Sequence, residues 1–152
     1  MEYCSGGDLG HLLKKAKGGI REEKIRPIIC EIILAIRELH IRNIIFRDLK
    51  PDNVLIDREG HIKVTDFGLS KILRKDNYEL SNSFCGSTAY MTPEMLQKKP
   101  HGKSIDWYGV GALLYECLVT VPPYYDEDQD KLYENITSAP LKLPTFLSED
   151  CQ

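Results

Sequence analysis

Apolar residues recur along the chain in two helical patterns. Over residues 25–39 they lie three or four positions apart, which predicts a long amphipathic helix buried on one face. Pro27 has no backbone N–H, and we therefore expect the regular part of this helix to begin at about Arg26. Residues 104–118 are apolar on most sides, which predicts a second helix, capped by Ser104 and buried at the centre of the fold.

Shorter patterns predict a small helix and a β-hairpin in the first half of the chain. Asp8 is a candidate N-cap, and the leucines among residues 9–13 supply one apolar helix face. Residues 54–56 and 61–64 are β-prone runs joined by a turn that ends at Gly60, which is typical of an antiparallel hairpin. A hairpin of this size is not stable alone and must pack against other elements. The pattern therefore favours a mainly α chain of the α+β type.

The second half of the chain has one weakly patterned segment and one further helix. Residues 74–86 show little apolar periodicity and much Ser, Asn and charge, which predicts an exposed loop. The acidic residues among 126–130 precede a weaker helical pattern through Leu132 and Ile136. Negative charge suits a helix N-terminus, so we expect this helix to begin at the acidic cluster.

Composition fits one globular domain. Of the 152 residues, 42% are hydrophobic and 28% charged, which argues against a disordered or collagen-like chain. The formal net charge of -3 gives no electrostatic reason to expect a nucleic-acid partner, because polyphosphates call for a basic surface. Any phosphate chemistry must therefore depend on a local site.

The spacing of the cysteines and the length of the hydrophobic runs indicate the cellular compartment of the protein. Five cysteines, widely spaced and without a C-x-x-C pair, fit neither a disulfide scaffold nor a zinc ribbon. A span of about 18 uninterrupted apolar residues, which a membrane helix needs, does not occur. The first residues lack the basic and then apolar pattern of a secretory signal. We therefore predict a cytoplasmic protein without a membrane span.

Two polar motifs carry the candidate chemistry. Phe46-Arg47-Asp48-Leu49-Lys50-Pro51-Asp52-Asn53 follows the long predicted helix, and Asp66-Phe67-Gly68 follows the second strand of the hairpin. Each motif alone occurs by chance in many proteins. In this order, on a framework of helix, loop, hairpin and loop, they resemble the catalytic loop and metal-binding motif of protein kinases. The resemblance implies the C-terminal lobe of a protein-kinase fold, mainly helical with a small β-hairpin.

The resemblance also implies roles for the polar residues. Asp48 would accept the proton of a substrate hydroxyl or orient that hydroxyl, and Lys50 would meet the developing phosphate charge. Asn53 and Asp66 would hold Mg²⁺ on ATP, since hard cations prefer oxygen ligands. Gly68 would permit the sharp turn that aims Asp66 inward. The lysine at position 50 resembles serine/threonine kinases rather than tyrosine kinases, so a protein or peptide with Ser or Thr is the expected substrate.

The first nine residues resemble the hinge that binds the nucleotide base. On this alignment the backbone of Glu2 and Cys4 would bond the adenine edge, and Leu55 would form the floor of its pocket. Asp8 would lie near the ribose or the incoming peptide. Met1 would occupy the gatekeeper position, although it can equally be an ordinary first residue without a packing role.

The segment that starts at Ser83 resembles the activation segment of the AGC group of serine/threonine kinases. Ser83 would carry an activating phosphate, added by an upstream kinase, and that phosphate would pair with Arg47. The alternative is that Ser83 is one of several loop serines without a switch role. Ser87 would hydrogen-bond Asp48 and Lys50, as the peptide-positioning threonine of the family does.

Two further residues are implied to support the catalytic loop. Asp106 resembles the aspartate at the start of the central kinase helix, which bonds back to the backbone of the catalytic loop. Phe46 stands where the family usually has His, and AGC kinases often have Tyr there. Because that position packs against the Asp-Phe-Gly segment, we expect an aromatic ring to be tolerated.

The domain organisation is expected to be partial. Residues 1–152 correspond to hinge, catalytic loop, activation segment and central helix, with neither a glycine-rich loop nor a strand lysine before the hinge. We therefore expect no N-terminal lobe, weak or no activity of the isolated chain, and uncovered apolar surface. Two alternatives are open: a non-catalytic kinase-lobe binding module or scaffold, and an oxygen-ligand metal protein of another kind.

Overall fold

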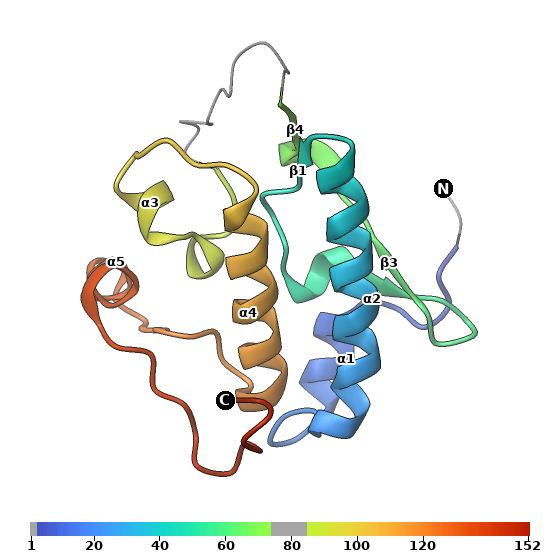
Figure 1. The fold of residues 1–152 in the computed structure, drawn as a ribbon. Coiled ribbons are helices and arrows are strands. Elements are labelled where there is room, and N and C mark those ends of the chain that lie inside the picture. Colours follow the sequence, from blue (N-terminus) through green and yellow to red (C-terminus); the bar gives the residue numbers. More distant parts are fainter. Residues whose placement is uncertain (1–2, 74–84) are drawn as a thin grey trace.

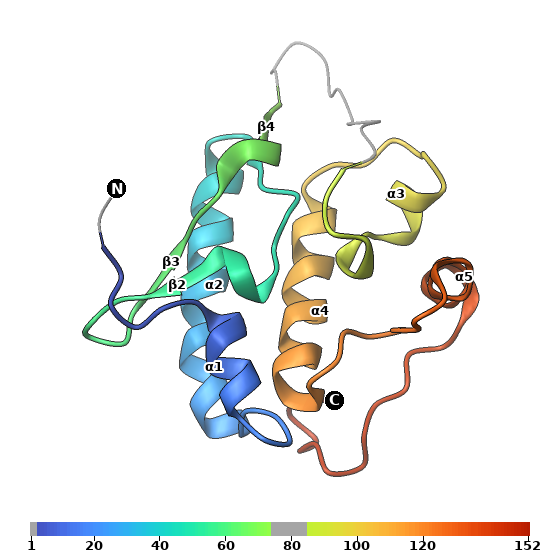
Figure 2. The same cartoon turned by 180° about the vertical axis from the view of Figure 1, so that it is seen from behind.

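The computed structural model describes residues 3–73 and 85–152. Within them helices α2 and α4 run side by side through the middle of the molecule (Figure 1). The hairpin lies on the outer side of α2, and α3 and α5 lie beyond α4, as the opposite view also shows (Figure 2). The helices are α1 (Leu9–Lys15), α2 (Glu22–Ile41), α3 (Pro93–Leu96), α4 (Ser104–Val119) and α5 (Gln129–Ser138). The strands are β1 (Ile44–Ile45), β2 (Val54–Ile56), β3 (Ile62–Val64) and β4 (Lys71–Ile72).

Helix α2 begins earlier than its proline suggested. It starts at Glu22, so the prediction of a regular helix from about Arg26 was wrong. Pro27 leaves the Glu23 carbonyl without its helical N–H partner, but both residues are exposed, so that carbonyl can bond water. Two glutamates in the first turn also suit the positive end of the helix dipole.

Helix α4 covers the segment that its apolar pattern predicted, but the prediction that Ser104 caps it was wrong. Ser104 is the first helical residue, and the cap position belongs to Lys103, which makes no side-chain capping bond. The helix is central but not fully covered, since Trp107 is 41% exposed. It ends where Thr120 takes a φ of 76° and donates its N–H to the Glu116 carbonyl.

The predicted carboxylate caps of α1 and α5 are confirmed. The Asp8 carboxylate accepts the His11 N–H at 2.7 Å and starts α1. Asp128, inside the acidic cluster, accepts the N–H groups of Asp130 and Lys131 and starts α5. Each carboxylate therefore satisfies a donor that the first helical turn leaves without an internal partner.

The predicted hairpin is present, together with a strand pair that the local pattern did not reveal. β2 pairs antiparallel with β3 in the register Val54 to Val64, and the Thr65 N–H extends this pairing to the Asn53 carbonyl. β1 pairs antiparallel with β4. The partners in the second pair lie far apart in sequence and are two residues long, so neither has a detectable period of its own.

The core lies mainly between α2 and α4. Its larger cluster joins apolar residues of α1, α2 and α4 with Phe46 and Leu49 of the loop after β1, and the smaller cluster lies around α3. The completely buried side chains include Leu9, Ile32, Ile36, Phe46 and Leu113. Among the described residues, no helix combines the length and the apolar character that crossing a membrane requires.

Candidate active site

The loop between β1 and the short 3-10 turn Pro51–Asn53 is anchored on the start of α4. The backbone N–H groups of Phe46 and Arg47 donate to the two carboxylate oxygens of Asp106 at 2.9 and 2.8 Å. His40 Nε2 lies 2.7 Å from the same carboxylate. Asp106 is buried, with only 2% of its surface exposed. The bonds expected of Asp106 are therefore confirmed. They hold Arg47, at a φ of 73°, in a backbone conformation that L-residues rarely adopt.

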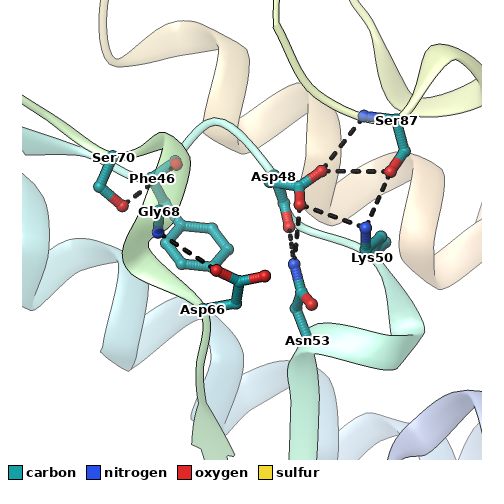
Figure 3. A network of polar contacts seen from close by, with 8 residues as sticks. All are labelled: Phe46, Asp48, Lys50, Asn53, Asp66, Gly68, Ser70 and Ser87. Atoms are coloured by element: carbon teal, nitrogen blue, oxygen red, sulfur yellow. Dashed lines mark hydrogen bonds and ion pairs between the residues drawn. The ribbon is translucent and has the colours of Figure 1, made fainter.

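Four of the predicted site residues meet in one hydrogen-bonded cluster (Figure 3). Asp48, buried at 7% exposure, accepts the Asn53 side-chain amide at 3.0 Å and forms an ion pair of 3.2 Å with Lys50. The Ser87 hydroxyl and N–H both donate to Asp48 at 3.2 Å. Lys50 Nζ donates to the Ser87 hydroxyl at 3.0 Å, so both hydrogen-bond partners expected of Ser87 are observed. The cluster therefore brings a carboxylate and an ammonium group together at a place that is largely shielded from solvent.

Asp66 follows β3 by two residues and lies next to the aromatic pair that the two motifs form. The Phe46 and Phe67 rings meet edge to face with centroids 5.4 Å apart, as expected for the residue that replaces His. Figure 3 shows the Asp66 carboxylate turned toward the side on which Asp48 and Asn53 lie.

The sharp turn falls on a different residue than predicted. Asp66 itself has a φ of 62°, whereas Gly68 donates its N–H to the Asp66 carboxylate at 3.2 Å. Gly68 is not in the left-handed region, so the expectation that its freedom makes the turn was wrong. An aspartate tolerates this conformation because its short polar side chain bonds the backbone locally.

The donor atoms fit a hard divalent cation. Asn53 uses its side-chain nitrogen for bonds to the Asp48 carbonyl, at 2.8 Å, and to the Asp48 carboxylate, which leaves its side-chain oxygen for a cation. Asp66 has one carboxylate oxygen that the Gly68 bond does not use. Over the part of the chain that is described, no group of three His, Cys, Asp or Glu side chains could hold a metal. A cation here would need further oxygens from phosphate or water, as Mg²⁺ commonly does.

The segment before α1 lies against the hairpin. Gly6 N–H donates to the Ile56 carbonyl at 2.9 Å, and Ile56 N–H donates to the Gly7 carbonyl at 2.8 Å. Asp8 forms an isolated antiparallel bridge with Leu55, which is half-buried. The structure therefore brings Asp8 and Leu55 together, and Cys4 precedes Asp8 by four residues in the chain. Glu2 and Met1 lie outside the described residues.

Arg47 and the segment after residue 84 lie together, whereas Ser83 is outside the described residues. Arg47 Nε donates to the Leu69 carbonyl at 2.5 Å, which ties the loop after β1 to the short 3-10 turn Phe67–Leu69. A Cβ added to Gly86 would meet the Arg47 carbonyl at 2.9 Å, so only glycine fits this close approach. The predicted pairing of Arg47 with a phosphate on Ser83 stays a prediction.

Sequence patterns missed a contact that supports the segment holding Ser87. The Tyr90 hydroxyl donates to the Glu116 carboxylate in the second half of α4. Burial raises the pKa of Glu116 above its usual range, although the Tyr90 hydrogen bond acts in the opposite direction. Burial likewise raises the pKa of Tyr90, so its hydroxyl keeps the proton that it donates. The two residues are far apart in sequence and belong to no local motif, so only the tertiary structure reveals the pair.

The chain is similar to known protein kinases over its whole length. Residues 1–150 match the family model of the protein kinase domain. It is 41% identical over 152 residues to a RAC family serine/threonine-protein kinase homolog of Dictyostelium discoideum, a match that covers 100% of this chain and 34% of that relative. It is 42% identical over 152 residues to cAMP-dependent protein kinase type 3 of Saccharomyces cerevisiae, covering 100% of this chain and 37% of that relative.

A human relative gives the same result. The chain is 41% identical over 144 residues to the serine/threonine-protein kinase Sgk2 of Homo sapiens, which covers 95% of this chain and 39% of Sgk2. The chain therefore spans between 34% and 39% of the length of these three relatives.

Proposed function

The chain belongs to the protein kinase family, and on that premise we propose that residues 1–152 form part of the C-terminal lobe of a serine/threonine kinase. The proposed reaction transfers the γ-phosphate of ATP to a Ser or Thr hydroxyl of a protein. The observation that carries the proposal is the single cluster of Asp48, Lys50, Asn53 and Ser87 with Asp66 beside it. A purely structural loop has no need for this full set of base, cation and metal-binding groups.

In this proposal Asp48 and Lys50 serve the acceptor side of the reaction. Asp48 accepts the proton of the substrate hydroxyl or orients that hydroxyl toward the phosphate. Lys50 lies 3.2 Å from Asp48 and can meet negative charge that develops on the transferred group. Ser87 bonds both side chains and in this proposal helps to position the substrate peptide at them.

Asn53 and Asp66 serve the nucleotide side. They would hold Mg²⁺ through the side-chain oxygens that their hydrogen bonds leave available. When bound, such an ion would supply positive charge to the phosphate oxygens of the nucleotide. Leu55 would lie under the adenine, with the backbone of Glu2 and Cys4 at its edge and Asp8 near the ribose or peptide.

Acidic groups near the site favour a substrate with basic residues. A Cβ added to Gly10 would lie 3.1 Å from a carboxylate oxygen of Asp8 and 3.2 Å from one of Asp52. A peptide with positive charge next to its Ser or Thr would neutralise this surface.

Regulation by an upstream kinase at Ser83 is part of the proposal. A phosphate there would add about -1.5 to -2 charges, and Arg47 is the proposed partner. If a Ser83→Ala variant is as active as the parent, the proposed regulation at Ser83 is wrong. The catalytic proposal is not affected by that result. The cytoplasmic location likewise stays a prediction.

The test combines binding and transfer on the purified chain. Calorimetry would measure ATP affinity with and without Mg²⁺ for the parent, Asp66→Ala and Asp48→Asn. Labelled ATP would then be offered with otherwise identical basic peptides that contain Ser, Thr or Tyr. We expect Mg²⁺-dependent binding that Asp66→Ala abolishes and Asp48→Asn retains. Transfer should be slow at most, since nucleotide positioning contributes much of the rate, confined to Ser and Thr, and lost in Asp48→Asn.

Two outcomes would contradict the proposal. Absence of any Mg²⁺-dependent ATP binding by the parent would remove the nucleotide site. Tight binding of a protein partner without nucleotide, unchanged in Asp66→Ala and without detectable phosphate transfer, would favour the binding module or scaffold instead.

A further inference from the structure

A polar contact outside the site joins the hairpin to α2. Glu31, half-buried on α2, places one carboxylate oxygen 2.8 Å from the Ile62 backbone nitrogen and the other 2.7 Å from His61 Nδ1. Both partners lie at the start of β3. We call these contacts among Glu31, His61 and Ile62 the hairpin clamp.

The clamp satisfies a backbone donor that the hairpin cannot satisfy. In the β2–β3 ladder, Asp57 N–H bonds the His61 carbonyl and Thr65 N–H bonds the Asn53 carbonyl. N–H groups alternate sides along an antiparallel strand, so the Ile62 N–H points away from β2. The Glu31 carboxylate accepts this edge donor, which otherwise would bond only water.

The same hairpin carries the proposed metal-binding residues at its other end. Asn53 immediately precedes β2, and Asp66 follows β3 by two residues. The Thr65 N–H to Asn53 carbonyl bond, 3.0 Å long, joins the two strands next to both residues. At about 3.4 Å per residue, the clamp lies roughly 10 Å along β3 from that bond.

We propose that Glu31 is a positioning residue for the nucleotide site: the hairpin clamp fixes β3 on α2 and thereby holds Asn53 and Asp66 in their mutual arrangement. The inference rests on the proposed function only in taking Asn53 and Asp66 as metal-binding residues. The clamp itself is observed. Without the clamp, apolar packing of the half-buried Ile62 and Val64 still holds the strand. Apolar packing is non-directional, so the strand then has more freedom to shift.

Protonation of His61 makes the clamp depend on pH. The groups that act on His61 are Glu31 from α2 and Asp57 and Glu59 from the hairpin turn, and Lys63 lies close to Asp57. The hydrogen bond to Glu31, followed by the charges of these carboxylates, raises the pKa of His61 above its ordinary 6.5. The bonds from Ile62 and His61 lower the pKa of Glu31 below its ordinary 4.5.

The two shifts define the range in which the clamp is strongest. A raised histidine pKa stabilises the folded state fully below pH 6.5, and that contribution disappears as the pH rises through the folded-state value. A lowered carboxylate pKa stabilises above pH 4.5 and that contribution disappears as the pH falls through the folded-state value. The clamp should therefore be complete between these values and loosen toward alkaline pH.

The experiment compares Glu31→Gln and His61→Gln with the control Glu38→Gln. Glu38 lies on the exposed side of the same helix and pairs with Arg42, one turn away. NMR would measure the pKa of His61 and the hydrogen-exchange rates of the Ile62 and Thr65 amides at pH 6 and pH 8. Calorimetry would measure the affinity for Mg²⁺ with ATP at the same two pH values.

The expected result is selective loosening. Glu31→Gln should return the pKa of His61 toward its ordinary value. Because the clamp is a solvent-exposed contact and therefore weak, Thr65 exchange should quicken by only about two- to fivefold at pH 6, and affinity for Mg²⁺ with ATP should fall by a similar factor. His61→Gln should make the protection factor of the Thr65 amide, which is the exchange rate corrected for base catalysis, the same at pH 6 and pH 8. Glu38→Gln should match the parent.

Each contrary result has a separate meaning. Unchanged Thr65 exchange in Glu31→Gln at pH 6 would overturn the inference. Faster exchange with unchanged affinity for Mg²⁺ with ATP would also overturn it, because the clamp would then not position the site. If the parent binds no Mg²⁺ with ATP at all, the proposed function fails, and Thr65 exchange alone decides whether the clamp holds the hairpin.

Discussion

The catalytic-loop region, residues 46–53, and the C-terminal region, residues 139–152, are both largely without regular secondary structure, but they are anchored differently. In the first region, Phe46 is completely buried and Asp106 accepts two backbone N–H groups. In the second, Leu147 is 7% exposed, whereas Phe146 is 68% exposed.

This difference teaches how an irregular segment becomes well defined. Backbone N–H groups that have no ladder or helix partner must bond something else, and in a buried place a carboxylate is a strong acceptor. Asp106 fulfils this role for the catalytic-loop region. The C-terminal region has a surface counterpart, in which Ser148 donates its N–H and hydroxyl to Glu22 at 2.8 and 2.5 Å. Water competes for those bonds, so the same kind of contact stabilises the backbone less there.

The largest contrast is expected from truncating one phenylalanine in each region. Phe46→Ala removes a completely buried ring that also contacts Phe67 and should destabilise the fold by about 3–5 kcal/mol. Phe146→Ala removes a ring that is 68% exposed and should change stability by no more than about 0.5 kcal/mol. Urea unfolding followed by circular dichroism measures both. A similar loss of unfolding free energy in the two variants would contradict the view that the two regions are anchored differently.

A smaller but still large effect is expected at the anchor itself. Asp106→Asn keeps the shape of the side chain but replaces an acceptor by a donor, which leaves a buried N–H or His40 without its partner. The free energy of unfolding should fall by about 2–4 kcal/mol. Asp150→Asn, an exposed change in the C-terminal region, is the matched control and should stay within about 0.5 kcal/mol. An Asp106→Asn variant as stable as its control would show that packing alone holds the loop.

The third test concerns Glu116, on the helix between the two regions. Because burial raises its pKa in the folded state, its contribution favours folding at low pH and weakens as the pH rises above 4.5. Glu116→Gln keeps an acceptor for the Tyr90 hydroxyl and cannot become charged. The melting temperature of the variant, relative to the parent, should therefore increase between pH 4 and pH 7. A constant difference across this range would contradict the direction of the shift.

The smallest effect is expected from Ser148→Ala. The change removes the hydroxyl bond to Glu22 but keeps the backbone bond. Amide exchange within the C-terminal region should quicken, whereas exchange of Phe46 and Arg47 should not change. Mass spectrometry after deuterium labelling separates the two regions. Faster exchange throughout the molecule would mean that the C-terminal region stabilises the core more than its exposure indicates.

Much of the fold could be predicted from local patterns. Local periods and residue types that act within a few positions account for the existence of α4, the β2–β3 hairpin and the capping of α1 by Asp8. The start of α2 did not follow, because the cost of Pro27 depends on whether the Glu23 carbonyl faces water. That exposure is a tertiary property, and a single sequence does not encode it in a local period.

The candidate site divides in the same way. Motifs identified Asp48, Lys50, Asn53 and Ser87, and the structure brings them into contact. The hairpin clamp was not predicted because Glu31 lies 30 positions from His61 in sequence and stands in an ordinary charged helix face. Nothing in its own segment distinguishes it from Glu38.

The central claim is that Asn53 and Asp66 hold a divalent cation on a nucleotide beside Asp48. Mn²⁺ accepts similar oxygen ligands and broadens the NMR signals of nearby nuclei, so it reports the position of the ion. With Mn²⁺ and ATP, the amide signals of Asn53 and Asp66 should broaden while that of Ser148 stays sharp, and Asp66→Ala should abolish the effect. Broadening that persists in Asp66→Ala, or that centres instead on the acidic residues 126–130, would contradict the claim.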